Sequence, residues 1–60
     1  MKQNRKKFLV EIQKRGFPKS YEVIVSAASS LTCERVAIRK FARDNDEFEQ
    51  DLTVRRVEEL

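Results

Sequence analysis

The chain has few means of holding a fold together, and this constrains it more than any other feature. With 60 residues, it can bury only about 60% of the surface that its unfolded form exposes, so its stability should be marginal. Its one cysteine, Cys33, cannot form an internal disulfide, and the absence of histidine excludes the usual structural zinc site. We therefore expect a single domain, residues 1–60, that relies on well-capped helices or on association with another subunit.

The same residue inventory argues against catalysis and against a membrane. Histidine, the commonest general base, is missing, and no serine or cysteine has an evident activating partner. No apolar run approaches the roughly 18 residues of a membrane span, and the basic N-terminus lacks the apolar stretch of a signal peptide. We expect a cytoplasmic protein that is not an enzyme and that uses no cofactor, metal ion or small-molecule substrate.

Charge is distributed unevenly along the chain. Residues 1–43 hold 11 Lys or Arg against 3 Asp or Glu, whereas residues 44–60 hold 2 against 7. Basic charge concentrated in this way is typical of proteins that bind nucleic acid, although a merely solvated surface is the alternative.

The only glycine and the only proline lie together in Gly16-Phe17-Pro18 and mark the clearest break in the chain. Gly16 suits the left-handed position that ends a helix, and Asn4 suits an N-cap. Apolar residues between them can share one helical side. We predict a first helix over about 4–15. The apolar residues in question are Phe8, Leu9 and Ile12.

A second helix is predicted over about 21–30, with Ser20 as its N-cap. Its apolar residues recur at i, i+3, i+4 and i+7, which is one helical face. A strand over 21–25 is the alternative, but Ala27-Ala28 continue the helical period and have poor strand propensity. The residues of this face are Ile24, Ala27, Ala28 and Leu31.

A third helix is predicted over about 33–43, opened by Thr32 and separated from the second by only a tight turn. This is the spacing of a helix-turn-helix. The inward stripe of this third helix consists of Cys33, Ala37, Ile38 and Phe41.

A fourth helix is predicted over about 46–58, capped by Asp44 or Asn45. Its final apolar stripe is out of line with the rest, so we expect this stripe to contact a partner and to form a homo-oligomer through the C-terminal helix. The stripe consists of Val54, Val57 and Leu60. The fold class predicted overall is all-α, a bundle of three to four helices with a helix-turn-helix.

The outward face of the third helix is the predicted DNA-binding surface. Arginines at i, i+4 and i+8 form a basic ridge, and an α-helix fits the major groove of B-DNA. Arg can bind guanine with two hydrogen bonds, and Lys can meet a phosphate. The ridge consists of Arg35, Arg39 and Arg43, with Val36 and Lys40 alongside. Lys19 and Ser20, at the start of the second helix, are predicted phosphate contacts, and Lys2, Arg5, Lys6 and Lys7 form a basic arm.

The stretch from Lys7 to about Leu52 resembles the helix-turn-helix of small terminase subunits of tailed bacteriophages and of related transposase-type domains. The family pattern is an apolar helix, an Ala-Ala pair, an Arg-rich helix ending in an aromatic residue, and an acidic start to the next helix. Thr32, Phe41 and Asp46 stand where the family commonly has glycine, tryptophan and proline. The matching residues are Phe8-Leu9, Ile12, Ala27-Ala28, Arg35, Ile38, Lys40-Phe41 and Asn45-Asp46-Glu47-Phe48.

Together these observations predict sequence-selective binding of double-stranded DNA through a recognition helix. The resemblance implies recognition of a phage packaging site, and hence a location in the bacterial host cytoplasm if the protein is phage-encoded. The alternatives are a small regulator of transcription or recombination and a helical protein-protein interaction module.

Overall fold

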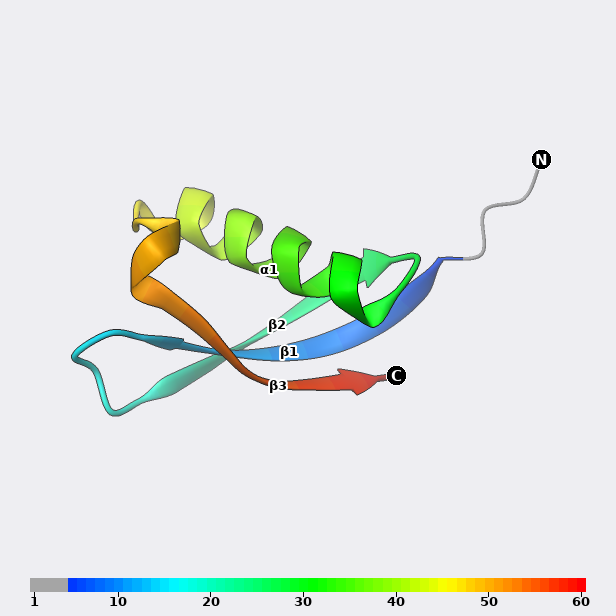
Figure 1. The fold of residues 1–60 in the computed structure, drawn as a ribbon, viewed down its shortest axis with the longest axis horizontal. Helices are drawn as coiled ribbons and strands as arrows, with labels where there is room; N and C mark the ends of the chain where they lie inside the picture. The colour runs from blue at the N-terminus through cyan, green and yellow to red at the C-terminus, as the bar shows by residue number, and fades with distance from the viewer. Residues whose placement is uncertain (1–4) are drawn as a thin grey trace.

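The computed structural model describes residues 5–60, which form a three-stranded antiparallel sheet covered on one face by one helix (Figure 1). The strands are β1 (Lys6–Lys14), β2 (Ser20–Ala27) and β3 (Leu52–Glu59), arranged in the order β2-β1-β3. The helix α1 (Ser30–Asn45) connects β2 to β3, with a 3-10 turn, η1 (Glu49–Asp51), before β3. The expectation of an all-α bundle with a helix-turn-helix is therefore wrong, because the described chain is α+β with a single α-helix. The resemblance to small terminase subunits and transposase-type domains is wrong for the same reason, since it rested on a helix-turn-helix that residues 5–60 do not form.

The helix expected over 4–15 is replaced by β1 because its buried residues alternate with a period of two. Phe8, Val10 and Ile12 are buried and face α1, while Leu9 and Glu11 between them lie on the other face. Phe8, Leu9 and Ile12 fit a helical side equally well, which is why the local pattern misled. The expected cap, Asn4, lies outside the described residues.

The helix expected over 21–30 is replaced by β2, so the strand alternative for 21–25 was the better interpretation. Val25 and Ala27 are buried beneath α1, whereas Ile24 is 58% exposed on the opposite face. β2 pairs with β1 in an unbroken antiparallel register from Gln13↔Ser20 to Lys6↔Ala27. A β-branched run that gains a full ladder of hydrogen bonds outweighs the helical preference of the two alanines.

The helix expected over 46–58 is also wrong, since most of it is β3. The pairing shifts from Glu11↔Arg56 to Ile12↔Val54, so Arg55 is the extra residue of a β-bulge. Because of this bulge, Val54 and Val57 both pack toward the core although they are three residues apart. A spacing of three is what made the stripe look helical.

The break at Gly16 is a turn between strands and does not end a helix. Phe17 N–H donates to the Lys14 carbonyl oxygen at 3.0 Å, and Gly16 has φ +83°, the value that the third position of a type II turn requires. Ser20 accordingly begins β2 and caps no helix; its hydroxyl donates to Glu11 Oε2 at 2.6 Å.

Helix α1 includes the range 33–43 for which a helix was expected, but it starts earlier. Its N-cap is Ser29, whose Oγ accepts from the Thr32 amide at 3.3 Å, so Thr32 lies in the first turn. Asp46 closes the helix in the left-handed conformation with φ 56°. Cys33 and Ala37 are fully buried against the sheet, because small side chains let the helix approach it closely.

The core lies between α1 and the sheet. Val10 and Ile12 on the central strand are wholly inaccessible to solvent, and Leu52 of β3 is buried as well. Ile38 and Phe41 of α1 are partly buried against this core, and the Phe41 ring stacks on Tyr21 with centroids 5.3 Å apart. The opposite face of the sheet is not covered by any part of the described chain (Figure 1).

Candidate nucleic-acid interface

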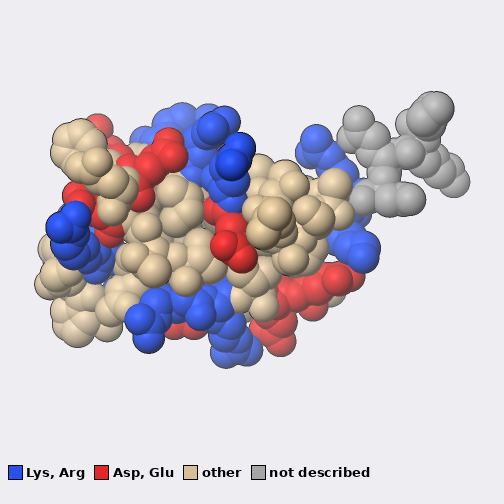
Figure 2. Space-filling model, in the orientation of Figure 1, with Lys and Arg blue, Asp and Glu red and all other residues tan. Residues whose placement is uncertain are grey.

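The side of α1 that faces away from the sheet carries the basic ridge that the sequence predicted to be exposed. The side chains of Arg35, Arg39 and Arg43 are all exposed, and Val36 is 37% exposed beside them. Eight residues of α-helix extend about 12 Å, so the backbone positions of the three arginines are spread over about 12 Å along one side of the helix. Figure 2 shows basic side chains gathered over α1 at the top of the molecule.

Two arginines of the ridge form no ion pair within the described chain. Arg35 and Arg39 have no carboxylate within ion-pair distance among residues 5–60. By contrast, Asp44 lies 3.7 Å from Lys40 Nζ and 3.6 Å from Arg43 Nε. Arg35 and Arg39 are thus available to bind an anion, whereas an anion at Lys40 or Arg43 would have to compete with the Asp44 carboxylate.

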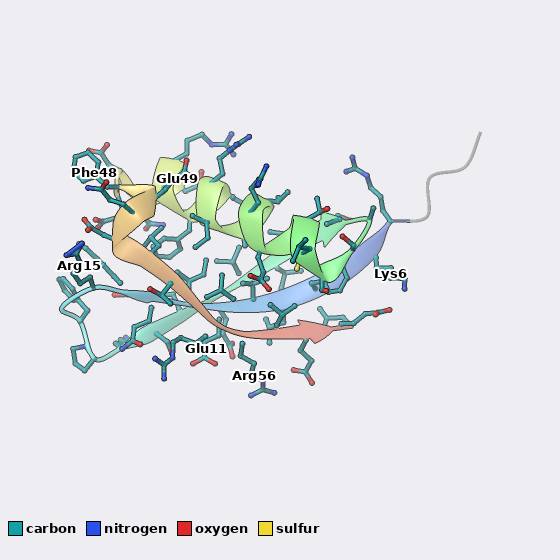
Figure 3. All side chains as sticks on the ribbon, in the orientation of Figure 1. Lys6, Glu11, Arg15, Phe48, Glu49 and Arg56 are labelled. Atoms are coloured by element: carbon teal, nitrogen blue, oxygen red, sulfur yellow. The ribbon has the colours of Figure 1, made fainter. Side chains whose placement is uncertain are left out.

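Acidic and aromatic residues bound the ridge at the C-terminal end of α1. Phe48 is 71% exposed and lies with Glu49 beside the end of the helix (Figure 3). Together with Asp46 and Glu47 they line a hollow against Arg39 and Arg43. Arg39 therefore borders these carboxylates without forming an ion pair, and Arg35 likewise borders Glu34 and Glu49 in a second hollow.

Ion pairs fold this acidic segment back onto the sheet. Lys14 Nζ lies 2.7 Å from Glu47 Oε2, with both side chains about three-quarters buried, and Arg15 NH2 lies 3.4 Å from Asp51 Oδ1. The Arg15 amide also donates to the Asp51 carbonyl oxygen at 2.7 Å. The acidic stretch after residue 43 therefore neutralises cations at the hairpin and leaves Arg35 and Arg39 unpaired.

The uncovered face of the sheet is a poorer surface for nucleic acid because it carries both signs of charge. Glu11 and Glu22 are directly opposite each other in the β1-β2 register, and Glu11 also faces Arg56 of β3. Figure 3 shows Glu11 and Arg56 on the side of the sheet away from α1. Carboxylates here would repel phosphates, and no aromatic side chain of the described strands lies on this face to stack on bases.

The structure does not bring the other predicted DNA contacts to the ridge. Lys19 lies exposed in the loop before β2, and Ser20 lies on the uncovered sheet face, where it binds Glu11. In the predicted basic arm, Lys6 pairs with Glu59 at 3.7 Å, and Lys2 lies outside the described residues.

The predicted partner stripe is divided by the fold. Val54 and Val57 are partly buried against the core, whereas Leu60 is 63% exposed at the end of β3.

The free edge of β2 is an exposed feature that the sequence did not lead us to predict. The signal that could have found it is the alternation of Tyr21, Val23 and Val25 with polar or exposed neighbours.

Cys33 is a buried thiol on the side of α1 that faces the sheet. Its Sγ donates to the Ser30 carbonyl oxygen at 3.0 Å. Burial, and secondarily the nearby Glu34 carboxylate, raise the pKa of the Cys33 thiol, because both disfavour the thiolate. The group is therefore suited to packing and poorly suited to nucleophilic chemistry.

No protein-family model matches the sequence, and comparison with curated proteins and with solved structures gives no significant match. Within residues 5–60, α1 is too short and too polar to cross a membrane, and no other helix there qualifies.

Proposed function

We propose that this protein binds double-stranded DNA through the exposed basic face of α1, in the cytoplasm and without catalysis. The observation that carries the proposal is the line of Arg35, Arg39 and Arg43, of which the first two have no acidic partner in the described chain. An arginine ridge on a protruding helix offers charge-assisted hydrogen bonds to phosphates and, in a groove, to base edges.

Duplex DNA fits this face better than other nucleic acids. The major groove of B-DNA, about 12 Å wide, admits an α-helix, whereas the major groove of A-form RNA is too narrow. Single strands are usually held by stacking on aromatic side chains. The exposed face of α1 carries none, and Phe48, which lines a hollow with Arg39 and Arg43, is accompanied there by the carboxylates of Asp46, Glu47 and Glu49.

A salt titration with two matched triple variants tests the proposal. The first variant replaces Arg35, Arg39 and Arg43 by glutamine. The second replaces Lys7, Arg55 and Arg56, which are exposed on the sheet, by glutamine. Both lose the same charge, so only the position of the cations differs. Binding to a fluorescent duplex is measured by anisotropy at several salt concentrations, and far-UV circular dichroism verifies folding.

We expect the wild type to show log K falling linearly with log salt, by about 0.9 per phosphate neutralised. The helix variant should lose most of its affinity and of this slope, and the sheet variant should keep most of both. If both variants lost the same affinity, binding would depend only on the net charge of the protein and not on α1. If the wild type did not bind duplex DNA at low salt, the proposed function would be excluded.

Selectivity for sequence is assigned to Arg39, the middle residue of the ridge. Arg39→Lys keeps the charge but loses the planar pair of donors that recognises guanine. Selection from random duplexes should give the wild type a preferred motif, and the variant should lose preference at a guanine while its affinity for random DNA changes little. Identical motifs from both proteins would show that Arg39 contacts only the backbone.

A further inference from the structure

The edge of the sheet formed by β2 is open and unguarded. All eight residues of β2 pair with β1 on one side, and the other side meets no strand of the described chain. Its only charged residue is Glu22, and it contains neither proline nor a bulge. Proteins normally protect such edges, because unpaired backbone groups recruit further strands.

The opposite edge, β3, has the protection that β2 lacks. Arg55 forms a bulge in β3, and four of its eight residues are charged. The β3 edge is therefore protected against pairing with another strand, whereas the β2 edge is not. Pairing with a further strand is expected at β2 alone.

Apolar side chains flank the β2 edge on both faces of the sheet. Ile24 is 58% exposed on the uncovered face. On the helix face, a groove between β2 and α1 is lined by Tyr21, Val23 and Phe41. An additional strand at this edge would cover apolar surface on both of its sides, besides completing the hydrogen-bond ladder.

We propose that the partner at this edge is a second copy of the chain, whose β2 pairs antiparallel with the first about a two-fold axis at Ile24. The sequence of β2 is self-complementary about this residue. Residues at equal distances from Ile24 then lie opposite each other: Val23 against Val25, Glu22 against Ser26, and Tyr21 against Ala27. Apolar residues meet apolar residues, and each Glu22 carboxylate meets a serine hydroxyl of the other copy.

Displacement of the axis to Val23 removes this match. Glu22 would then oppose Ile24, and a carboxylate would lie against an apolar side chain at the centre of the junction. The rim of the groove is also compatible with an identical partner, since it carries both Lys40 and Asp44. A symmetric contact brings one cation and one anion from each copy to the junction.

The symmetry fixes the arrangement of the dimer. Paired residues of an antiparallel ladder point to the same face, so the two-fold axis is perpendicular to the sheet. The result is a continuous six-stranded sheet with both copies of α1 on one face and the two basic ridges on the same side. The dimer does not rest on DNA binding, and its tests below contain no DNA.

Single cysteines test the register. In Ile24→Cys, the two introduced thiols face each other across the axis, at a separation that a disulfide can span. In Ser26→Cys, at a residue that is also exposed, each thiol faces Glu22 of the other copy, and the two thiols are about 14 Å apart along the strands. Cys33 is buried in both variants. Under mild oxidation by copper phenanthroline, Ile24→Cys should give a covalent dimer on a non-reducing gel, and Ser26→Cys should give little. Equal cross-linking of both variants, or none of Ile24→Cys, would overturn the proposal.

Sedimentation equilibrium under reducing conditions tests the dimer without cross-links. The wild type should change from the mass of one chain to that of two as its concentration rises. Ile24→Lys opposes two like charges at the axis and should remain monomeric, yet it should fold because Ile24 is exposed. Leu31→Lys, at a residue 80% exposed on α1, is the matched control and should still dimerise. A wild type that stays monomeric at high concentration, or a folded Ile24→Lys that dimerises, contradicts the model of the interface.

Discussion

At the scale of single residues, Ile12 at the centre of β1 has the greatest influence on stability. It is wholly buried in a core made largely of small side chains. Ile12→Ala should cost about 2–5 kcal/mol, which is a large part of the stability that a domain of this size has. Leu31→Ala, at an exposed residue, should change stability by less than about 0.5 kcal/mol. Urea unfolding measures both, and a small effect at Ile12 would show that the sheet face assigned to the core is wrong.

Cys33 provides a residue-scale prediction about pH. Its raised pKa means that the folded state retains the thiol proton at pH values where the unfolded state releases it. The contribution of Cys33 to stability is therefore full below the thiol's ordinary pKa and declines as pH rises above it. Cys33→Ala should abolish this alkaline decline, although it lowers stability overall. If the free energies of unfolding of the wild type and of Cys33→Ala changed in parallel with pH through the alkaline range, the raised pKa of Cys33 would be contradicted. In the wild type, a thiol reagent should modify Cys33 far more slowly in the native protein than in urea.

The residues of α1 were predictable because their environment is set within the helix itself. Cys33 and Ala37 on one side and Arg35 and Arg39 on the other follow from the helical period alone, and the structure places them on the buried and exposed faces as expected. By contrast, whether Leu9 is buried depends on what lies across β1. That information comes from strands up to about fifty residues away in the chain and is not contained in a local pattern.

At the scale of elements, the three strands were mistaken for helices for two physical reasons. Phe8, Leu9 and Ile12 satisfy both periods, so hydrogen bonding to neighbours decides between them. In β3, the bulge at Arg55 gives Val54 and Val57 a helical spacing within a strand. The β-branched content of β2 was the more reliable signal, and a consistent weighting of it would have predicted the hairpin around Gly16.

The start of α1 gives a prediction about an element. Ser29 is the N-cap residue, and its Oγ accepts the Thr32 amide. Ser29→Ala should lower stability by about 1 kcal/mol, and Ser29→Asp should restore it, because a carboxylate accepts the same bond and suits the positive end of the helix dipole. Ser30→Ala, one residue later, should be neutral or slightly stabilising. If all three variants unfold at the same urea concentration, capping at Ser29 contributes nothing.

At the scale of the whole molecule, the DNA-binding prediction from sequence depended on a charge asymmetry that the fold redistributes. Lys14 and Arg15 are paired with Glu47 and Asp51, so they no longer count toward a basic surface. Arg35 and Arg39 on α1 form no ion pair within the described chain, although Glu49 lies beside the end of the helix (Figure 3). A sequence-based charge count cannot anticipate which cations are neutralised, since the pairs join residues more than thirty positions apart.

This arrangement predicts that one carboxylate restrains DNA binding. Asp44→Asn removes the acidic partner shared by Lys40 and Arg43, so both become available for phosphates. Glu58→Gln changes the net charge by the same amount and frees Arg56, but on the uncovered sheet face. If α1 is the interface, Asp44→Asn should bind duplex DNA more tightly and with a steeper salt dependence, by up to about 0.9 in the slope for each phosphate gained. Glu58→Gln should gain only the small benefit of a higher net charge, with an unchanged slope. Anisotropy titrations of the two variants at several salt concentrations measure this difference directly, and indistinguishable gains would mean that DNA senses the overall charge of the protein and not the ridge.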